Sequence, residues 1–243
     1  CLGNYKIGKE TVPIAEIEEV VVGTNTMSSQ DFFDLTVVNL LIKIFIHGDT
    51  YKPIFEILRR NNIKSMEIIT QILEITCNEF PRFKDFLDDF VKVGKNKCFD
   101  NKDELEKILS KPSSIDNFIN GNLGQNELLA YRAKALRKYY KDCTQVLQSA
   151  IKSILKKKNL EDEELREYLN EAFKFCEIRK FDFIAMKDCE ANFSFDFVKG
   201  DRNNFNVDPK EIRNNVNIRF YYKDEKNTFK KYLKFYGNSN DYQ

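Results

Sequence analysis

Apolar and polar positions follow two different periods along the chain. From residue 28 to about residue 180, apolar residues recur every three or four positions, as they do in an amphipathic helix. After residue 180 the period falls to two, as in a strand with one buried face. The pattern predicts a mainly α protein of the α+β class. Its multi-helix, bundle-like body should carry a short N-terminal strand and a small C-terminal antiparallel β element.

The start of the chain predicts one strand. Residues 1–14 are expected to be irregular. Ala15–Val22 should form a strand, because they contain three consecutive β-branched valines, and Gly23 should end it. We therefore expect the first regular element to lie just before the sequence Thr24–Ser28.

A long helix is expected directly after this segment. Ser28 with Asp31 three residues later resembles a capping box, which marks a helix N-terminus. Apolar residues then appear almost all round the helix, so it should be buried on more than one side. The residues expected in the core are Phe32, Leu40, Leu41 and Ile44.

Further elements are separated by proline, glycine and polar residues. The expected helices are one opened by Pro53, one capped by Ser65 and broken by Pro81, Phe83–Val91, a short helix from Asp100, one long helix Gln125–Lys158, and Glu161–Cys176; the expected loop is 111–124. The expected strands are Phe181–Phe183, Phe193–Phe197, Asn217–Phe220 and Tyr232–Phe235. The chain should thus divide into residues 1–27, a helical body 28–180, and a β appendage 181–243 packed on the same domain.

Composition and charge exclude several classes of protein. The 243 residues are 42% hydrophobic, with 21 Phe, which favours a globular fold over a disordered chain. Lys and Arg (39) nearly balance Asp and Glu (38), so no basic excess indicates nucleic-acid binding. The most apolar segment, Val37–Ile46, is too short to span a bilayer. We expect no membrane span.

The six cysteines are scattered, without CxxC or CxxxCxxC spacing, and indicate free thiols in the reducing cytoplasm. Cys1 leaves two alternatives open. It could be the lipid-bearing first residue of a bacterial lipoprotein, or the chain could be the C-terminal piece of a longer protein. We favour the piece, because CLGNYKIGKE lacks the polar tether expected after a lipidated cysteine.

Most candidate chemistry has a simpler structural explanation. His47, the only histidine, stands where it would serve a helix C-terminus. The lysines at 152 and 156–158 are followed by acidic residues at 161–164. The lysines lie at the C-terminus of one expected helix and the acids at the N-terminus of the next, where each charge interacts favourably with the helix dipole. The acidic and amide residues between 201 and 208 lack the glycine and closing Glu of a calcium loop, so a polar hairpin loop is expected there.

The sequence Thr24–Ser28 is the remaining candidate site. Thr24, Asn25 and Thr26 follow the expected strand, and polar side chains at the carboxyl edge of a strand can bind a ligand. The alternative, that they only close a turn, has equal weight. Helix capping alone explains Ser28.

These residues also carry a resemblance to a known family. EEVVVGTNTMSSQDFFDLTVVNLLIKIFIHGD, residues 18–49, resembles the segment that follows the catalytic barrel in radical S-adenosylmethionine enzymes with a cobalamin-binding domain. FSFDFV, residues 193–198, is a second and weaker match, and CLGNYKIG would be the exit from the barrel. The resemblance covers about the first 60 residues.

The resemblance implies a parent enzyme that holds a [4Fe-4S] cluster, S-adenosylmethionine and cobalamin. This chain lacks the CxxxCxxC motif and a cobalamin domain, so we expect no cofactor, metal ligand or catalytic residue in it. Its implied role is a substrate-binding and capping domain with Thr24, Asn25, Thr26 and His47 facing the substrate. Its partners would be the N-terminal catalytic part of the same protein and a small-molecule or peptide substrate.

A stand-alone helical protein-interaction module, or a lipoprotein if Cys1 is lipidated, is the alternative function. The encoding reading frame discriminates between the two. A CxxxCxxC motif upstream of Cys1 would favour the enzyme, and an apolar signal segment would favour the lipoprotein.

Overall fold

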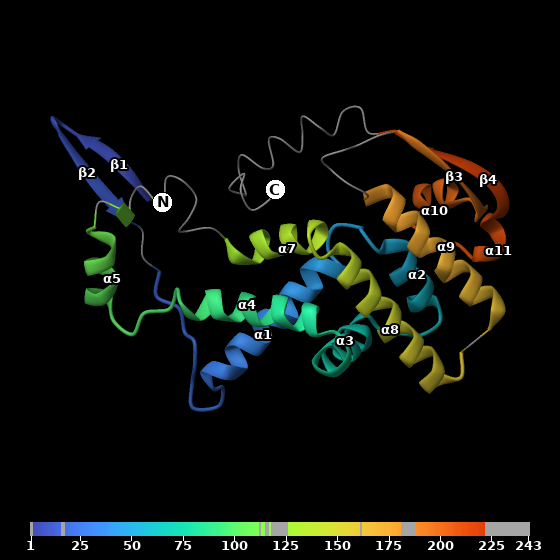
Figure 1. Cartoon of the computed structure of the whole chain (residues 1–243), viewed down its shortest axis with the longest axis horizontal. Helices are drawn as coiled ribbons and strands as arrows, with labels where there is room; N and C mark the ends of the chain where they lie inside the picture. Colours follow the sequence, from blue (N-terminus) through green and yellow to red (C-terminus); the bar gives the residue numbers. More distant parts are fainter. Residues whose placement is uncertain are drawn as a thin grey trace. The chain divides into compact units, whose positions relative to one another are not determined.

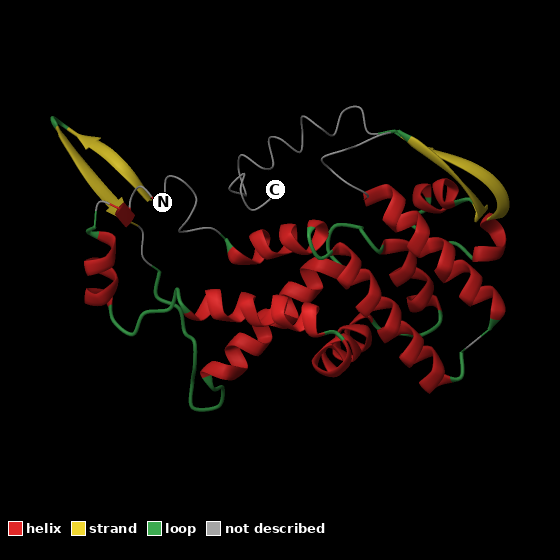
Figure 2. Cartoon of the chain, in the orientation of Figure 1, coloured by secondary structure: helices red, strands yellow, loops and turns green. Residues whose placement is uncertain are grey.

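The computed structural model describes residues 2–15, 18–111, 113–114, 117, 126–160, 162–180 and 188–221. The fold is mainly helical, with one antiparallel strand pair near the N-terminus and another near the C-terminus (Figure 2), which confirms the expected fold class. The expected strands at 181–183 and 232–235, and most of the expected loop at 111–124, lie outside the described residues.

The elements follow one another as shown in Figure 1. The strands are β1 (Leu2–Ile7), β2 (Glu10–Ala15), β3 (Cys189–Phe195) and β4 (Arg213–Phe220). The helices are α1 (Ser29–Phe45), α2 (Lys52–Arg60), α3 (Ser65–Glu79), α4 (Pro81–Lys95), α5 (Lys102–Leu109), α7 (Glu127–Arg137), α8 (Tyr140–Lys158), α9 (Glu163–Lys180), α10 (Phe197–Arg202) and α11 (Pro209–Ile212). None of these helices is long and apolar enough to cross a membrane.

The chain forms two compact units. The first contains Cys1–Leu40 and Phe86–Lys134, and the second contains Leu41–Asp85 and Ala135–Lys230. Lys231–Gln243, grouped with the first unit, lie outside the described residues. In the first unit, Tyr131 of α7 packs between the rings of Phe86 and Phe90 of α4. Its hydroxyl donates to Asp89 Oδ2 at 2.5 Å, which gives this buried tyrosine a polar partner.

The N-terminal strands differ from the sequence prediction. Residues 2–15, expected to be irregular, form the β1–β2 hairpin around Gly8, whose φ of 64° suits glycine in a tight turn. Of the expected strand Ala15–Val22, Ala15 is the last residue of β2, residues 16–17 lie outside the described residues, and residues 18–24 are not in a strand. Val20 and Val21 are 57% and 69% exposed. No described strand pairs with these valines, so their β propensity is not sufficient to form a strand here.

Helix α1 confirms the core prediction for three of its four residues. Leu40, Leu41 and Ile44 are completely buried, whereas Phe32 is half-buried. The helix ends at Phe45, and Gly48 and Asp49 then turn the chain with positive φ angles of 94° and 58°. Pro53 lies in the first turn of α2, where its missing N–H is not needed.

Helix α3 differs from the prediction at its N-terminus, because Lys64 and not Ser65 is the N-cap residue. The expected helix Gln125–Lys158 is in fact two helices, α7 and α8, separated at Lys138 and Tyr139. Tyr139 lies under the Arg82 guanidinium, 5.4 Å from ring centroid to Cζ. Tyr140 stacks on the buried Tyr51 with ring centroids 5.9 Å apart. These tertiary contacts hold the two tyrosines where α7 and α8 are separated. The helical period of the sequence carries no sign of such contacts.

The C-terminal element packs on α9 through a cluster of aromatic rings. Phe175 of α9 contacts Phe193, Phe197, Phe205 and Phe220, with ring centroids between 4.8 and 6.4 Å apart. All five rings are buried. The cluster therefore anchors this element on the helix.

The strand bounds in this element also differ from the prediction. β3 ends at Phe195, and Phe197 already belongs to α10, so the expected strand Phe193–Phe197 is only partly correct. The expected strand Asn217–Phe220 lies within β4. The polar hairpin loop expected at 201–208 is replaced in part by α10, and α11 follows directly.

Candidate functional site

Thr24–Met27 form a turn that is held by its own hydrogen bonds. The Thr24 N–H donates to the Met27 carbonyl at 2.8 Å. Thr24 Oγ1 accepts from the backbone N–H groups of Thr26, at 3.3 Å, and Met27, at 3.1 Å. Thr24 therefore has a structural task in this turn, as the turn-closing interpretation predicts.

Asn25 differs from its neighbours in the turn. Its side chain is exposed and makes no hydrogen bond with the described residues. The Thr26 hydroxyl lies 3.3 Å from Thr24 Oγ1. Of the three predicted substrate-facing residues in the turn, Asn25 thus has the side chain that is most available to a ligand.

Ser28 and Asp31 form a reciprocal cap at the start of α1. The Asp31 carboxylate accepts from the Ser28 backbone N–H at 2.8 Å and from its hydroxyl at 2.7 Å. In return, Ser28 Oγ accepts from the Asp31 backbone N–H at 3.1 Å. The hydrogen bonds from Ser28 lower the pKa of the Asp31 carboxyl below its ordinary value. Capping explains Ser28, as the sequence predicts.

His47 lies just after α1, in the turn that leads to α2. It is exposed, and its backbone N–H donates to the Ile42 carbonyl at 3.0 Å. Thr24, Asn25 and Thr26 belong to the first compact unit and His47 to the second. The structure therefore gathers three of the four predicted substrate-facing residues in one turn and leaves His47 as a separate candidate.

A groove in the second unit was not predicted from the sequence. It has a volume of about 470 Å³ and is lined by α2, the start of α9 and α11. Its lining residues are Ile57, Arg60, Asn61, Asp162, Glu164, Leu165, Asp208, Pro209 and Lys210. Because three segments distant in sequence build it, no local motif could have identified it.

The charged side chains of the groove pair with one another. Arg60 lies 3.6 Å from Asp208, and Lys210 lies 3.6 Å from Glu164. Asp162 caps α9 by accepting from the Leu165 N–H at 2.9 Å. A polar ligand in this groove would therefore have to displace existing ion pairs.

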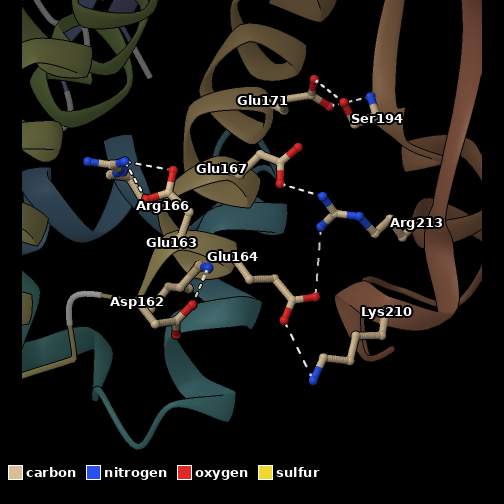
Figure 3. A network of polar contacts seen from close by, with 10 residues as sticks. Asp162, Glu163, Glu164, Arg166, Glu167, Glu171, Ser194, Lys210 and Arg213 are labelled. Atoms are coloured by element: carbon tan, nitrogen blue, oxygen red, sulfur yellow. Dashed lines mark hydrogen bonds and ion pairs between the residues drawn. The ribbon is translucent and has the colours of Figure 1, made fainter.

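Helix α9 holds the C-terminal β element with a row of acidic residues (Figure 3). Glu164 and Glu167 both face Arg213, with Glu167 Oε2 and Arg213 Nη2 only 2.6 Å apart. One turn further along, the Glu171 carboxylate accepts from the backbone N–H of Ser194 at 2.7 Å and from its hydroxyl at 3.1 Å. The register of β3 and β4 shifts between Phe193 and Phe195, so Glu171 supplies an acceptor to the residue at the irregularity.

The other charged candidates take part in structural contacts. Lys157 and Lys158 at the end of α8 bind residues of α3, with Lys157 Nζ 2.7 Å from Gln71 Oε1 and Lys158 Nζ 3.1 Å from Glu67 Oε1. Asp208 caps α11 by accepting from the Lys210 N–H at 3.0 Å. Asp201 lies 3.6 Å from Arg179.

Burial changes the acidity of one thiol and two phenol groups in the second unit. Burial raises the pKa of the Cys143 thiol and of the Tyr51 and Tyr140 hydroxyls well above their ordinary values. The Tyr51 hydroxyl lies 3.0 Å from Thr144 Oγ1, which satisfies it inside the core. These groups remain protonated near neutral pH.

The metal-ligating side chains of the described residues are not clustered. Within them, no three His, Cys, Asp or Glu side chains are grouped so that they could hold a metal ion. Cys77, Cys98 and Cys189 are exposed, whereas Cys143 and Cys176 are buried. The five described cysteines are thus not grouped as the ligands of a metal cluster.

Comparison with known proteins gives no relative: no family model, no curated protein and no solved structure matches the chain.

Proposed function

We propose that this chain is the C-terminal substrate-binding and capping domain of a radical S-adenosylmethionine enzyme of the cobalamin-binding-domain family. The observation that carries the proposal is the resemblance of residues 18–49 to the segment after the catalytic barrel. In this proposal the [4Fe-4S] cluster, S-adenosylmethionine and cobalamin belong to the catalytic part of the same cytoplasmic protein. This chain is not catalytic by itself.

The distribution of exposed apolar side chains supports the proposal. Among the described residues, Tyr5, Ile7, Val20, Val21 and Leu35, between 43% and 69% exposed, belong to the first compact unit, and Met66, Val198 and Tyr221, between 40% and 62% exposed, belong to the second. Five of these eight exposed apolar residues thus belong to the first unit, and exposed apolar side chains can form an interaction surface. We assign their cover to the catalytic part of the parent enzyme.

The β1–β2 hairpin has one face suited to such a contact. Tyr5 is paired with Val12 and Ile7 with Glu10, which places the three apolar side chains on one face together with Glu10. Lys6 and its partner Thr11 lie on the other face. Among the described strands, β1 and β2 pair only with each other. A lone hairpin is marginally stable in water, so cover on its apolar face would stabilise it.

The proposed role follows from the chemistry of radical enzymes. Reactive intermediates require a site from which water is excluded, and a domain that closes over the barrel can supply that cover. Asn25 would contribute a neutral hydrogen-bonding group to the substrate. Thr26 is the other side chain of this turn proposed to face it, while Thr24 orders the turn.

The encoding reading frame provides the first test. The proposal expects a CxxxCxxC motif upstream of Cys1, within a barrel-forming sequence of alternating strands and helices. A frame that begins with an apolar signal segment ending directly before Cys1 would overturn the enzyme assignment.

A stand-alone interaction module is the second candidate. The same exposed residues, Tyr5, Ile7, Val20, Val21 and Leu35, favour it, because they could equally bind a separate protein. If Cys1 is lipidated, this module would be a lipoprotein. A signal segment in the reading frame would support this candidate as directly as it would contradict the first.

A further inference from the structure

We draw no further inference here: the strongest candidate, the groove lined by α2, the start of α9 and α11, carries nothing, because its charged side chains already pair with one another or cap helices and nothing in the structure shows what covers it.

Discussion

In the turn before α1, neighbouring residues of similar polarity have different tasks. Thr24 uses its hydroxyl to accept two backbone N–H groups, whereas the exposed Asn25 makes no hydrogen bond with the described residues. The two alternatives that the sequence leaves open, ligand binding and turn closure, thus apply to different residues of the same turn. This division can be tested because the two substitutions should affect different quantities.

Under the proposed function, Asn25→Ala in the full-length protein should lower kcat/KM for the substrate and leave Tm nearly unchanged. The substitution removes a hydrogen-bonding amide that has no structural partner among the described residues. Thr24→Ala is the matched variant, and it should lower Tm because Thr26 and Met27 lose their acceptor. Steady-state kinetics and thermal unfolding measure both effects. If Asn25→Ala keeps full kcat/KM and lowers Tm, the turn has only a structural role.

Ser28→Ala should destabilise the protein by about 0.5–2 kcal/mol through loss of the N-cap. Ser29→Ala is the control, because Ser29 is exposed and its side chain has no hydrogen bond with the described residues. Urea unfolding at neutral pH compares the two variants. Equal losses for both would show that the reciprocal bonds of Ser28 and Asp31 have no net effect.

The same cap predicts a pH dependence. The folded pKa of Asp31 lies below its ordinary value of 3.8, because the ionised form accepts the Ser28 hydrogen bonds. Its stabilising contribution is therefore complete above the unfolded pKa and is lost as pH falls through the folded pKa. Carboxyl chemical shifts should place the Asp31 midpoint below 3.8, and in Ser28→Ala the midpoint should rise. An unchanged midpoint in Ser28→Ala would contradict this account.

Leu41→Ala should cost about 2–5 kcal/mol, because the side chain is fully buried in α1 and its removal leaves a cavity. Leu35→Ala on the same helix is the matched control, since Leu35 is 59% exposed and should change stability by less than about 0.5 kcal/mol. Denaturant unfolding gives both values. A loss below about 0.5 kcal/mol for Leu41→Ala would contradict the assigned burial.

At the scale of elements, the sequence pattern was sufficient to predict a helix where its local signals agree with its packing in the fold. The cap at Ser28 and the apolar period after it fixed α1, and the buried Leu40, Leu41 and Ile44 confirm its phase. Proline placed the start of α2 in the same way. Such elements are predictable because their own residues determine both the boundary and the buried face.

The prediction was wrong where partners distant in sequence decide the structure. Val20–Val22 have strand propensity, but the described residues provide no strand to pair with them. The break between α7 and α8 depends on contacts of Tyr139 with Arg82 and of Tyr140 with Tyr51. Neither contact leaves a signal in the local period of the helix.

The junction between α9 and β3 gives a test at this scale. Glu171→Ala should destabilise the protein by about 1–3 kcal/mol, because the Ser194 N–H at the register shift loses its acceptor. Glu163→Ala is the control on the same helix, since Glu163 is 80% exposed and pairs with Arg166 within α9.

Urea unfolding and hydrogen exchange of the Ser194 amide measure these effects. We expect faster exchange at Ser194 in Glu171→Ala and an unchanged rate in Glu163→Ala. Equal exchange rates in the two variants would show that the Glu171 carboxylate does not hold the irregular strand.

At the scale of the whole molecule, the fold class was predictable and the arrangement of candidate sites was not. The change of period from helix to strand is a global property of the sequence, and it is confirmed. The groove combines residues as far apart in the sequence as Ile57 and Lys210. In the sequence, its charged residues look the same as those of an ordinary solvent-exposed surface. The exposed apolar side chains of the first unit are equally hard to predict from the sequence. Tyr5, Val20 and Leu35 become recognisable only through their exposure in the folded unit.

We propose that the chain belongs to a radical enzyme whose cofactors lie elsewhere in the same protein. Iron content after anaerobic reconstitution tests it most directly, measured for residues 1–243 and for the product of the complete reading frame. We predict about four irons per chain in the complete product, held as one cluster, and none in residues 1–243. A complete product without a cluster, or residues 1–243 with stoichiometric iron that is lost on substitution of their cysteines, would contradict the account.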